Sequence, residues 1–358
     1  MKKRLLFSLF LFSAIFCVFF NPATCAELKE INLSQAVKLA LENNIDLKIA
    51  NLDLENAQIN YQKNEAANLF SNSNYLGLQI DLNLAQAEDN CRQTRNQIII
   101  NIAQHYFQLN QVKRDILIKE KQVKLEKKYL EEIKDQIETG NKGSLDLLKQ
   151  ENRYDNAVFN LERVNDDYGQ YLGEFQIELG LNQGEGYKFL EVECPRVWQI
   201  REEEVLRETL KNSFSLKARK RQIELEEVDL ERAQVAGVPE LDLKKIKNDK
   251  KLANLNYEKI KKELDSLAKK QYYFFRQAIK SLDLYRQNMV QAQENNNIVV
   301  EQVKVNLGTE TELLSAEINL LQAGYNYYST ITNYHLNKLA LQQLMGEKIE
   351  VVILNEQI

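Results

Sequence analysis

The stretch Gly140-Asn141-Lys142-Gly143-Ser144-Leu145-Asp146-Leu147-Leu148 decides the fold, because turn residues are followed at once by the start of an amphipathic helix. The helix that it predicts runs to Leu179-Gly180. A related stretch, Leu307-Gly308-Thr309-Glu310-Thr311-Glu312-Leu313-Leu314, starts a second helix that ends at Met345-Gly346. The two helices have nearly the same length, which predicts an internal repeat built from helical hairpins.

The composition favours long helices. The chain has 358 residues, of which 44% are hydrophobic and 28% charged, but it has only 3 prolines and 12 glycines. A sheet-rich protein of this size needs more of these turn residues. The net charge of −5 comes from 47 basic and 52 acidic residues mixed along the chain, so we expect no basic surface for nucleic acid.

The N-terminus predicts export. Lys2-Lys3-Arg4 precede an apolar run from Leu5 to Phe20, and small residues follow up to Ala26, which is the layout of a signal peptide at residues 1–26. An uncleaved anchor is the alternative, although the run is shorter than the roughly 20 residues that span a bilayer. The exported chain keeps Cys91 and Cys194, which form no CxxC pair and are expected to stay unpaired.

The longest predicted helix covers residues 84–139, which contain neither proline nor glycine. Its apolar residues recur at steps that are all sums of 3 and 4, which is the pattern of a coiled-coil seam. They are Ile98, Ile102, Leu109, Val112, Ile116, Val123, Leu130, Ile133 and Ile137. Such a helix would be about 85 Å long, a length that suits a bundle, tube or rod.

The repeat predicts the domain boundaries. We expect the first repeat at residues 27–181, a linker at 182–204, the second repeat at 205–346 and a tail at 347–358. Leu210-Lys211-Asn212 matches Leu41-Glu42-Asn43 near the start of each repeat. The hairpin turns are expected near residues 140–146 and 306–312, with Gly308 matching Gly143 and Gly346 matching Gly180.

Few strands are expected. Residues 70–83 predict one short strand, because a turn cluster precedes a crude period-two alternation of apolar residues. In the second half, residues 237–242 predict only a short break, with helix resuming from residue 248. Residues 351–353 predict a short terminal strand or a disordered tail.

Residues able to carry chemistry are scarce. His105 and His335 lie within predicted helices and are expected to be packed or interfacial, and Trp198 in the linker is also expected to pack. No metal-ligand spacing, phosphate-binding glycine loop or serine-elbow motif is present in the sequence. We therefore expect no enzyme activity, no cofactor and no metal site.

Five motifs follow one another along the chain: Leu33-Ser34-Gln35-Ala36-Val37-Lys38-Leu39-Ala40-Leu41-Glu42-Asn43-Asn44, residues 143–148, Leu179-Gly180, residues 308–314 and Gly346. Taken in order, these motifs resemble the TolC family of outer-membrane efflux proteins over residues 30–346. The resemblance implies an all-α dominant fold of long antiparallel coiled-coil hairpins in two tandem repeats. It also implies a homotrimer with a periplasmic helical tube and a twelve-stranded barrel in the outer membrane. The partners that it implies are a periplasmic adaptor protein and an inner-membrane pump.

The same resemblance assigns a role to the hairpin turns. It places six residues at the tips that contact the adaptor, namely Gly143, Ser144, Asp146, Gly308, Thr309 and Glu312. A purely structural explanation of the two glycines is equally open, because a turn between helices often needs glycine for a positive φ.

The sequence departs from the family where the family has its membrane strands. A spanning strand needs roughly 9–11 residues, and residues 70–83 and 237–242 are too short for two strands and a turn each. We therefore expect little or no strand at the membrane end. Two functions follow as hypotheses. The chain is a conduit for efflux or type I secretion at the outer membrane, or a relative without a barrel that serves as a periplasmic structural or adaptor coiled coil.

Overall fold

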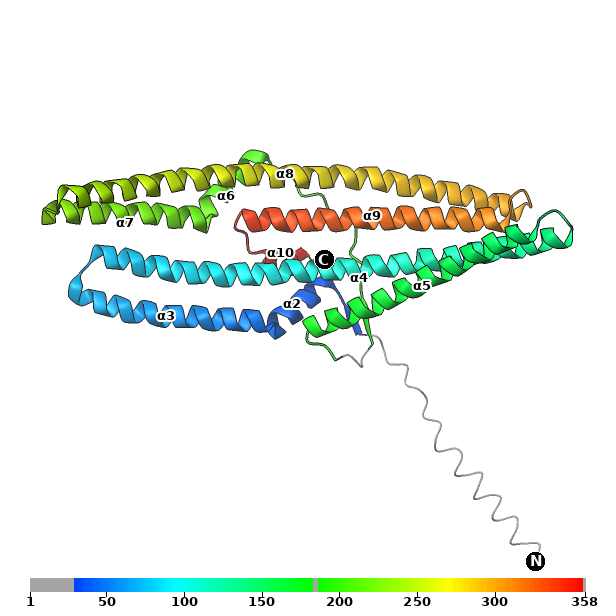
Figure 1. The fold of residues 1–358 in the computed structure, drawn as a ribbon, viewed down its shortest axis with the longest axis horizontal. Coiled ribbons are helices and arrows are strands. Elements are labelled where there is room, and N and C mark those ends of the chain that lie inside the picture. The colour runs from blue at the N-terminus through cyan, green and yellow to red at the C-terminus, as the bar shows by residue number, and fades with distance from the viewer. Residues whose placement is uncertain (1–28, 183–185, 357–358) are drawn as a thin grey trace, which may run out of the picture.

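Two sets of four helices lie along one another in an elongated molecule (Figure 1). The computed structural model describes residues 29–182 and 186–356, so the predicted signal peptide lies outside the described residues. The first set is α2 (Leu33–Asn43), α3 (Ile45–Ser71), α4 (Asn74–Glu138) and α5 (Ser144–Glu178). The second set is α6 (Glu202–Asn212), α7 (Phe214–Ala236), α8 (Glu240–Lys304) and α9 (Glu310–Leu344). Three short elements complete the described chain: β1 (Lys29–Ile31), β2 (Tyr187–Phe189) and α10 (Ile349–Glu356).

The helix lengths recur from one set to the other. Helices α4 and α8 have 65 residues each, α5 and α9 have 35 each, and α2 and α6 have 11 each. In the first set, α3 packs antiparallel along the first part of α4 and α5 along its second part (Figure 1). In the second set, α7 and α9 pack along α8 in the same way. The all-α dominant fold with long antiparallel hairpins is therefore confirmed.

The strand predicted at residues 70–83 is wrong. Helix α3 continues to Ser71, Asn72 adopts a left-handed conformation with φ 43°, and α4 begins at Asn74. The hydroxyl of Ser73 accepts a hydrogen bond from the backbone N–H of Leu76 and so caps α4. The alternation of apolar and polar residues here is too short to specify a strand. The cap at Ser73 and the burial of Ile80 on the inward face of α4 favour a helix instead.

Two further expectations need correction. The break predicted at residues 237–242 is shorter, because Gly237 ends α7 with φ 64° and α8 already begins at Glu240. Residues 351–353 form neither a strand nor a disordered tail, since they belong to α10. Ile349 and Ile353 are four positions apart and fully buried, so the apolar residues here follow the helical period rather than the strand period.

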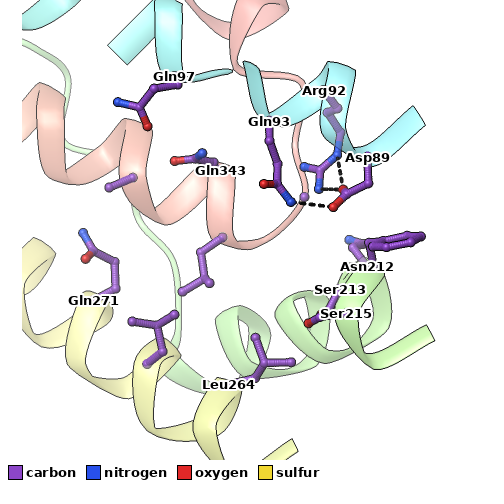
Figure 2. A pocket seen from close by; sticks show the side chains of 15 residues that line it. Asp89, Arg92, Gln93, Gln97, Asn212, Ser213, Ser215, Leu264, Gln271 and Gln343 are labelled. Atoms are coloured by element: carbon purple, nitrogen blue, oxygen red, sulfur yellow. Dashed lines mark hydrogen bonds and ion pairs between the residues drawn. The ribbon is translucent and has the colours of Figure 1, made fainter. Parts of the chain in front are cut away.

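The same asparagine contact closes each repeat. Asn43 at the end of α2 donates a hydrogen bond from Nδ2 to the carbonyl of Leu179, 2.9 Å away, directly before Gly180. Asn212, which is labelled in Figure 2, ends α6 and donates to the carbonyl of Met345 at 2.7 Å, directly before Gly346. The short first helix of each repeat is thus tied to the end of its last helix.

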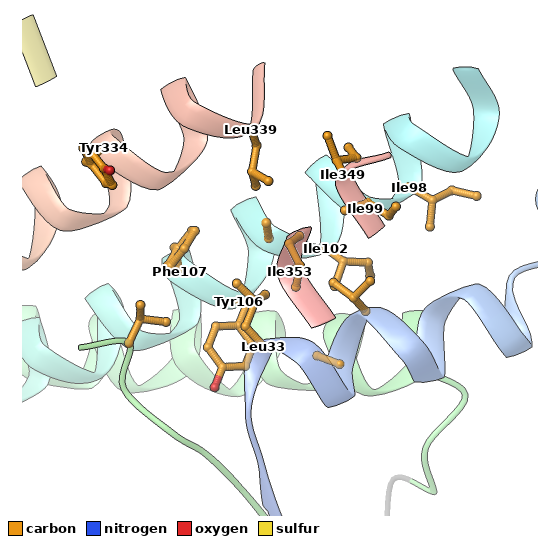
Figure 3. Packing of buried hydrophobic residues seen from close by; sticks show 14 of the residues in the cluster. Leu33, Ile98, Ile99, Ile102, Tyr106, Phe107, Tyr334, Leu339, Ile349 and Ile353 are labelled. Atoms are coloured by element: carbon orange, nitrogen blue, oxygen red, sulfur yellow. The ribbon is translucent and has the colours of Figure 1, made fainter. Parts of the chain in front are cut away.

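The apolar core gathers around the middle of α4. Figure 3 shows Tyr106 and Phe107 of α4 beside Tyr334 of α9, with α10 and the start of α2 closing the cluster. Strands β1 and β2 pair in parallel next to it, and Ile31 faces Phe189 in the pairing. Across the described residues, no helix combines the length and the apolar character that crossing a bilayer requires.

Candidate functional site

The turn between α4 and α5 forms the first tip. Gly140, with φ 77°, donates its backbone N–H to the carbonyl of Ile137 at 2.9 Å, and Asn141 donates to Gln136 at 2.8 Å. These two bonds satisfy carbonyls that the end of a helix leaves free, and together they form a Schellman motif. The left-handed residue at this tip is therefore Gly140.

The turn between α8 and α9 forms the second tip, and it uses the same motif. Asn306, with φ 60°, donates to the carbonyl of Val303 at 3.1 Å, and Leu307 donates to Gln302 at 2.8 Å. Asparagine tolerates the left-handed region better than most residues, so Asn306 takes the position that Gly140 holds in the first tip.

Acidic residues cap the returning helices at both tips. Gly143 is the N-cap of α5, and its N–H donates to the carboxylate of Asp146 at 3.2 Å. Thr309 is the N-cap of α9, and its N–H donates to the carboxylate of Glu312 at 2.7 Å. The hydroxyl of Thr309 accepts the N–H of Glu312 in return, which completes a capping box at the second tip only. These bonds to Thr309 lower the pKa of Glu312.

The structural match between the tips differs from the one expected. Gly143 corresponds to Thr309, because both are N-caps, and not to Gly308. Neither Gly143 nor Gly308 has the positive φ that the structural explanation required, since Gly143 has φ −111° and the left-handed residues are Gly140 and Asn306. That explanation of the two glycines is therefore wrong.

The two glycines differ in their surroundings. A Cβ on Gly308 would lie 3.2 Å from Cγ2 of Val303 and 3.3 Å from Cβ of Gln302, so tight packing against α8 explains this glycine. A Cβ on Gly143 would meet nothing within 4 Å. Neither backbone geometry nor packing within the described chain requires a glycine at position 143.

Apolar side chains flank the capping residues at both tips. Leu145 and Leu148 are 62% and 54% exposed on the first turns of α5, beside the exposed Ser144. Val305 and Leu307 are 60% and 80% exposed at the second tip. The structure thus brings the six predicted residues onto two similar turns at one end of the molecule (Figure 1). The exposed apolar residues were missed, because a helical pattern alone cannot show that a tip lacks a packing partner.

Ion pairs connect the two hairpins behind the tips. Lys128 of α4 lies 3.2 Å from the carboxylate of Glu310 in the first turn of α9, and Lys121 lies 2.5 Å from Glu317, further along α9. Glu310 and Glu131 raise the pKa of Lys128, because both accept hydrogen bonds from its ammonium group. The first and second hairpins are therefore linked by charged groups near the surface.

The predicted linker 182–204 contains β2, and its end already belongs to α6. We call residues 190–201 the strap. Tyrosine hydroxyls from the helices bind its backbone at both ends. The hydroxyl of Tyr106 on α4 lies 2.6 Å from the carbonyl of Leu190, and that of Tyr272 on α8 donates to the carbonyl of Ile200 at 3.3 Å.

Tyr334 of α9 holds the middle of the strap. Its hydroxyl accepts the N–H of Trp198 at 2.8 Å and donates to the carbonyl of Arg196 at 3.2 Å. The ring of Trp198 packs edge-on against Phe275, so the expectation that this residue packs is confirmed. The strap contacts were missed, because they join residues far apart in the sequence.

The histidines and cysteines occupy ordinary structural positions. His335 is buried, and burial together with Lys338 lowers its pKa to about 4. His105 joins α4 to the last turn of α5 through Glu178, with 2.7 Å between Nδ1 and the carboxylate. Cys91 is buried, Cys194 is exposed, and both are free thiols, as predicted.

A cavity of about 440 Å³ lies between α4, the α6–α7 junction, α8 and α9 (Figure 2). Its buried carboxylate, Asp89, accepts hydrogen bonds from Arg92 and Gln93 on its own helix and so has its partners already. Within the described parts of the chain, no group of three or more His, Cys, Asp and Glu side chains is arranged to hold a metal ion. The tips are therefore the better candidate site.

Solved outer-membrane channels share this fold. The outer-membrane channel OprN matches with a TM-score of 0.65 and 13% identity, covering 89% of this chain and 90% of its own. The CmeC outer-membrane channel of Campylobacter jejuni matches with a TM-score of 0.61 and 12% identity, covering 91% and 89%. The outer-membrane protein VceC of Vibrio cholerae matches with a TM-score of 0.59 and 13% identity, covering 88% and 96%. Neither the protein-family models nor the curated protein sequences yield a match to this chain.

Proposed function

We propose that this protein is the conduit component of a tripartite efflux or type I secretion system in the cell envelope. Three copies form a helical tube through which cargo passes passively, without a cofactor and without enzyme activity. The tips dock to a periplasmic adaptor, which connects the tube to an inner-membrane pump. The chain is exported and works at the outer membrane or in the periplasm.

One observation carries this proposal. The fold agrees with that of outer-membrane channels along about nine tenths of both chains, 89% of this chain and 90% of OprN, so the agreement includes both long hairpins. Helices of 65 residues are about 100 Å long and far exceed what a compact core needs. A tube is one arrangement that uses this length, and it is the one that the channels with this fold share.

Exposed apolar seams support assembly into such a tube. Ile45, Ile49, Leu52 and Ile59 of α3 follow one another at steps of 4, 3 and 7 and are 41% to 71% exposed. This is the spacing of a coiled-coil seam that lacks its partner helix. Helix α8 exposes a second row that a neighbouring copy can cover, namely Leu252, Leu255, Leu267, Phe274, Leu284, Val290 and Ile298.

The first tip supports docking to an adaptor. Glycine is one of several residues that suit the N-cap of α5, and its missing side chain leaves room for a surface that approaches the tip closely. The neighbouring Leu145 and Leu148 offer apolar area to the same surface. Asp146 and Glu312 hold the helix ends in shape through their capping bonds.

Opening of the tube requires the two hairpins of each copy to separate at the tips. The pairs Lys128–Glu310 and Lys121–Glu317 oppose this movement. The first pair is exposed and the second is partly buried near the surface. Because ion pairs that water reaches contribute little to stability, adaptor binding can break them without unfolding either hairpin.

A second function has one observation in its favour. Only Asn72 and Ser73 join α3 to α4, and only residues 237–239 join α7 to α8, so this end of the molecule is helical up to its turns. A structural or adaptor coiled coil in the periplasm needs no more than this. Such a protein would still dock through its tips but would conduct no cargo.

A substitution at Gly143 tests the docking tip. Gly143→Leu fits the backbone and meets no neighbouring atom at its Cβ, so we expect only the small loss of thermal stability that a poorer N-cap causes, but loss of cross-linking between the tip and the adaptor in cells. Lys142→Leu on the same turn is the matched control and should leave cross-linking intact. Full cross-linking by Gly143→Leu would contradict the tip assignment.

Export of a fluorescent cargo separates the two functions. A chain lacking residues 143–148 should lose both cross-linking and export if the protein is a conduit. Lost cross-linking with normal export would favour the structural or adaptor role.

A further inference from the structure

The end opposite the tips exposes large apolar side chains. Leu69 and Phe70 precede the α3–α4 turn and are 79% and 95% exposed, while Val235 and Leu241 flank the α7–α8 turn and are 90% and 80% exposed. Both turns lie at the same end of the molecule (Figure 1). We call these four residues the apolar cap.

The turns themselves do not require these side chains. Asn68 closes the first turn, because its Oδ1 accepts the N–H of Ser73 at 2.9 Å and its Nδ2 donates to the Ser73 carbonyl at 3.0 Å. Gly237 closes the second turn with φ 64°. The apolar cap thus stands outside the contacts that shape this end, and its exposure costs free energy in water.

The end that carries the apolar cap has few charged residues at its turns and basic residues directly behind them, as a protein that binds a bilayer surface would. Residues 66–80 and 233–239 contain no charged residue, although 28% of the whole chain is charged. Behind the cap, Lys244, Lys245 and Lys247 lie on the first turns of α8, roughly 5–10 Å along the helix from Leu241. Glu240 and Asp242 are the opposing charges there.

From these features we propose that the apolar cap inserts into the headgroup region of a phospholipid bilayer, while the three lysines bind lipid phosphates. Apolar tips followed by basic residues are typical of proteins that lie on a membrane surface. A lipid bilayer is deformable, so the α3–α4 turn and the α7–α8 turn can both insert into it without a matching binding pocket. The inference does not depend on the conduit function, because the tips lie at the other end.

Lipid quenching tests the insertion directly. The full exported protein is mixed with vesicles of phosphatidylethanolamine and phosphatidylglycerol that carry bromine on the acyl chains. The indole introduced by Phe70→Trp should be quenched, whereas Trp198, the single native tryptophan, packs against α8 far from this end and should be quenched much less. Equal quenching of the variant and the parent chain would overturn the proposal.

Vesicle sedimentation gives a second readout with a matched control. Phe70→Ser combined with Val235→Ser should lower the vesicle partition coefficient at least about tenfold, because the transfer of two large side chains is lost. Leu145→Ser with Leu148→Ser removes similar area at the tips and should leave vesicle binding unchanged while weakening adaptor cross-linking. This pair of variants keeps failure of the lipid proposal distinct from failure of the conduit proposal.

Two further measurements show whether lipid or another copy of the chain covers the apolar cap. Lys244→Gln with Lys247→Gln should weaken binding to vesicles with phosphatidylglycerol more than binding to vesicles without it. If Phe70→Ser with Val235→Ser instead dissociates the oligomer and leaves vesicle binding intact, the cap is a contact between copies of the chain and the lipid proposal fails.

Discussion

A glycine follows the end of α5 and another follows the end of α9. Because glycine has no side chain, the last helix of each repeat can contact the end of its first helix, α2 or α6. Gly180 and Gly346 have φ of 70° and 78°, a region that residues with a Cβ rarely adopt. A Cβ on Gly180 would lie 2.6 Å from Nδ2 of Asn43, and a Cβ on Gly346 would lie 2.6 Å from Cβ of Asn212. Each glycine therefore serves both the turn and the asparagine contact.

Gly180→Ala should lower the free energy of unfolding by at least about 1–2 kcal/mol, because alanine is strained in the left-handed region and also displaces Asn43. Urea unfolding at fixed protein concentration measures this change. Gly173→Ala is the matched control, because position 173 lies inside α5 and a methyl group added there would meet no atom within 4 Å. It should stabilise the protein by roughly 0.5–1 kcal/mol, and equal effects of the two substitutions would contradict the account.

His335 should make stability depend on pH. Its pKa is about 4 in the folded protein and near 6.5 when unfolded, so between these values only the unfolded chain binds the proton. The free energy of unfolding should therefore fall as the pH drops from 6.5 to 4, by an amount on the order of 3 kcal/mol.

His335→Phe isolates this contribution, because phenylalanine can keep the stacking on Phe107 and carries no proton. The variant should lose less stability than the parent chain between pH 7 and pH 5, as measured by urea unfolding. Burial raises the pKa of Glu347, which acts in the opposite direction but is common to both proteins. Parallel pH profiles would show that His335 does not titrate as described.

The tip residues show what sequence can and cannot predict at this scale. The turn positions and the acidic residues Asp146 and Glu312 were predictable, because turn residues followed by an acid signal a helix start. The pairing of Gly143 with Gly308 was not correct, because it matched residue types rather than capping positions. Asn306 can replace Gly140 in a left-handed turn, so residue identity alone hides the true correspondence.

At the scale of elements, the strap joins the two repeats through tyrosine hydroxyls. Tyr106→Phe and Tyr334→Phe each remove hydrogen bonds to its backbone, at a net cost of about 0.5–1.5 kcal/mol for each bond. The amides of residues 190–198 should then exchange with deuterium faster, while those of α4 should not. Tyr273→Phe is the control, since this ring is 57% exposed beside Tyr272. Unchanged exchange in the strap would contradict its attachment by tyrosines.

The long helices were predictable, and the short elements were not. The seam from Ile98 to Ile137 repeats often enough for the helical period to stand out, and it lies within α4. In contrast, residues 70–83 and 351–353 are too short for period alone to separate strand from helix. Their conformation depends on a serine cap in one case and on burial against α2, α4 and α9 in the other. The cap is a local signal, but it lies within a cluster of turn residues that also suits the start of a strand. The burial of α10 joins segments far apart in the sequence and cannot be read from local sequence.

At the scale of the whole molecule, the two repeats form an open arrangement with apolar seams on its outer helices. The seam on α3 and the row on α8 remain exposed in a single copy. The seam on α3 has the spacing of a coiled coil, and the row on α8 has enough apolar area to bind another helix. Assembly into the proposed trimer would cover both exposed rows. The tips lie at one end of the chain and the apolar cap at the other, so they mark the two ends of the proposed tube.

The mass of the protein purified in mild detergent tests this account most directly. Light scattering on the assembly should give three chains for the parent protein, and one chain for Leu267→Asp with Phe274→Asp, because these substitutions place charge on the exposed row of α8. Lys262→Asp with Lys269→Asp, which alters charge on the same helix without removing apolar area, should leave three chains. A parent protein that remains a single chain at micromolar concentration would contradict the trimeric conduit.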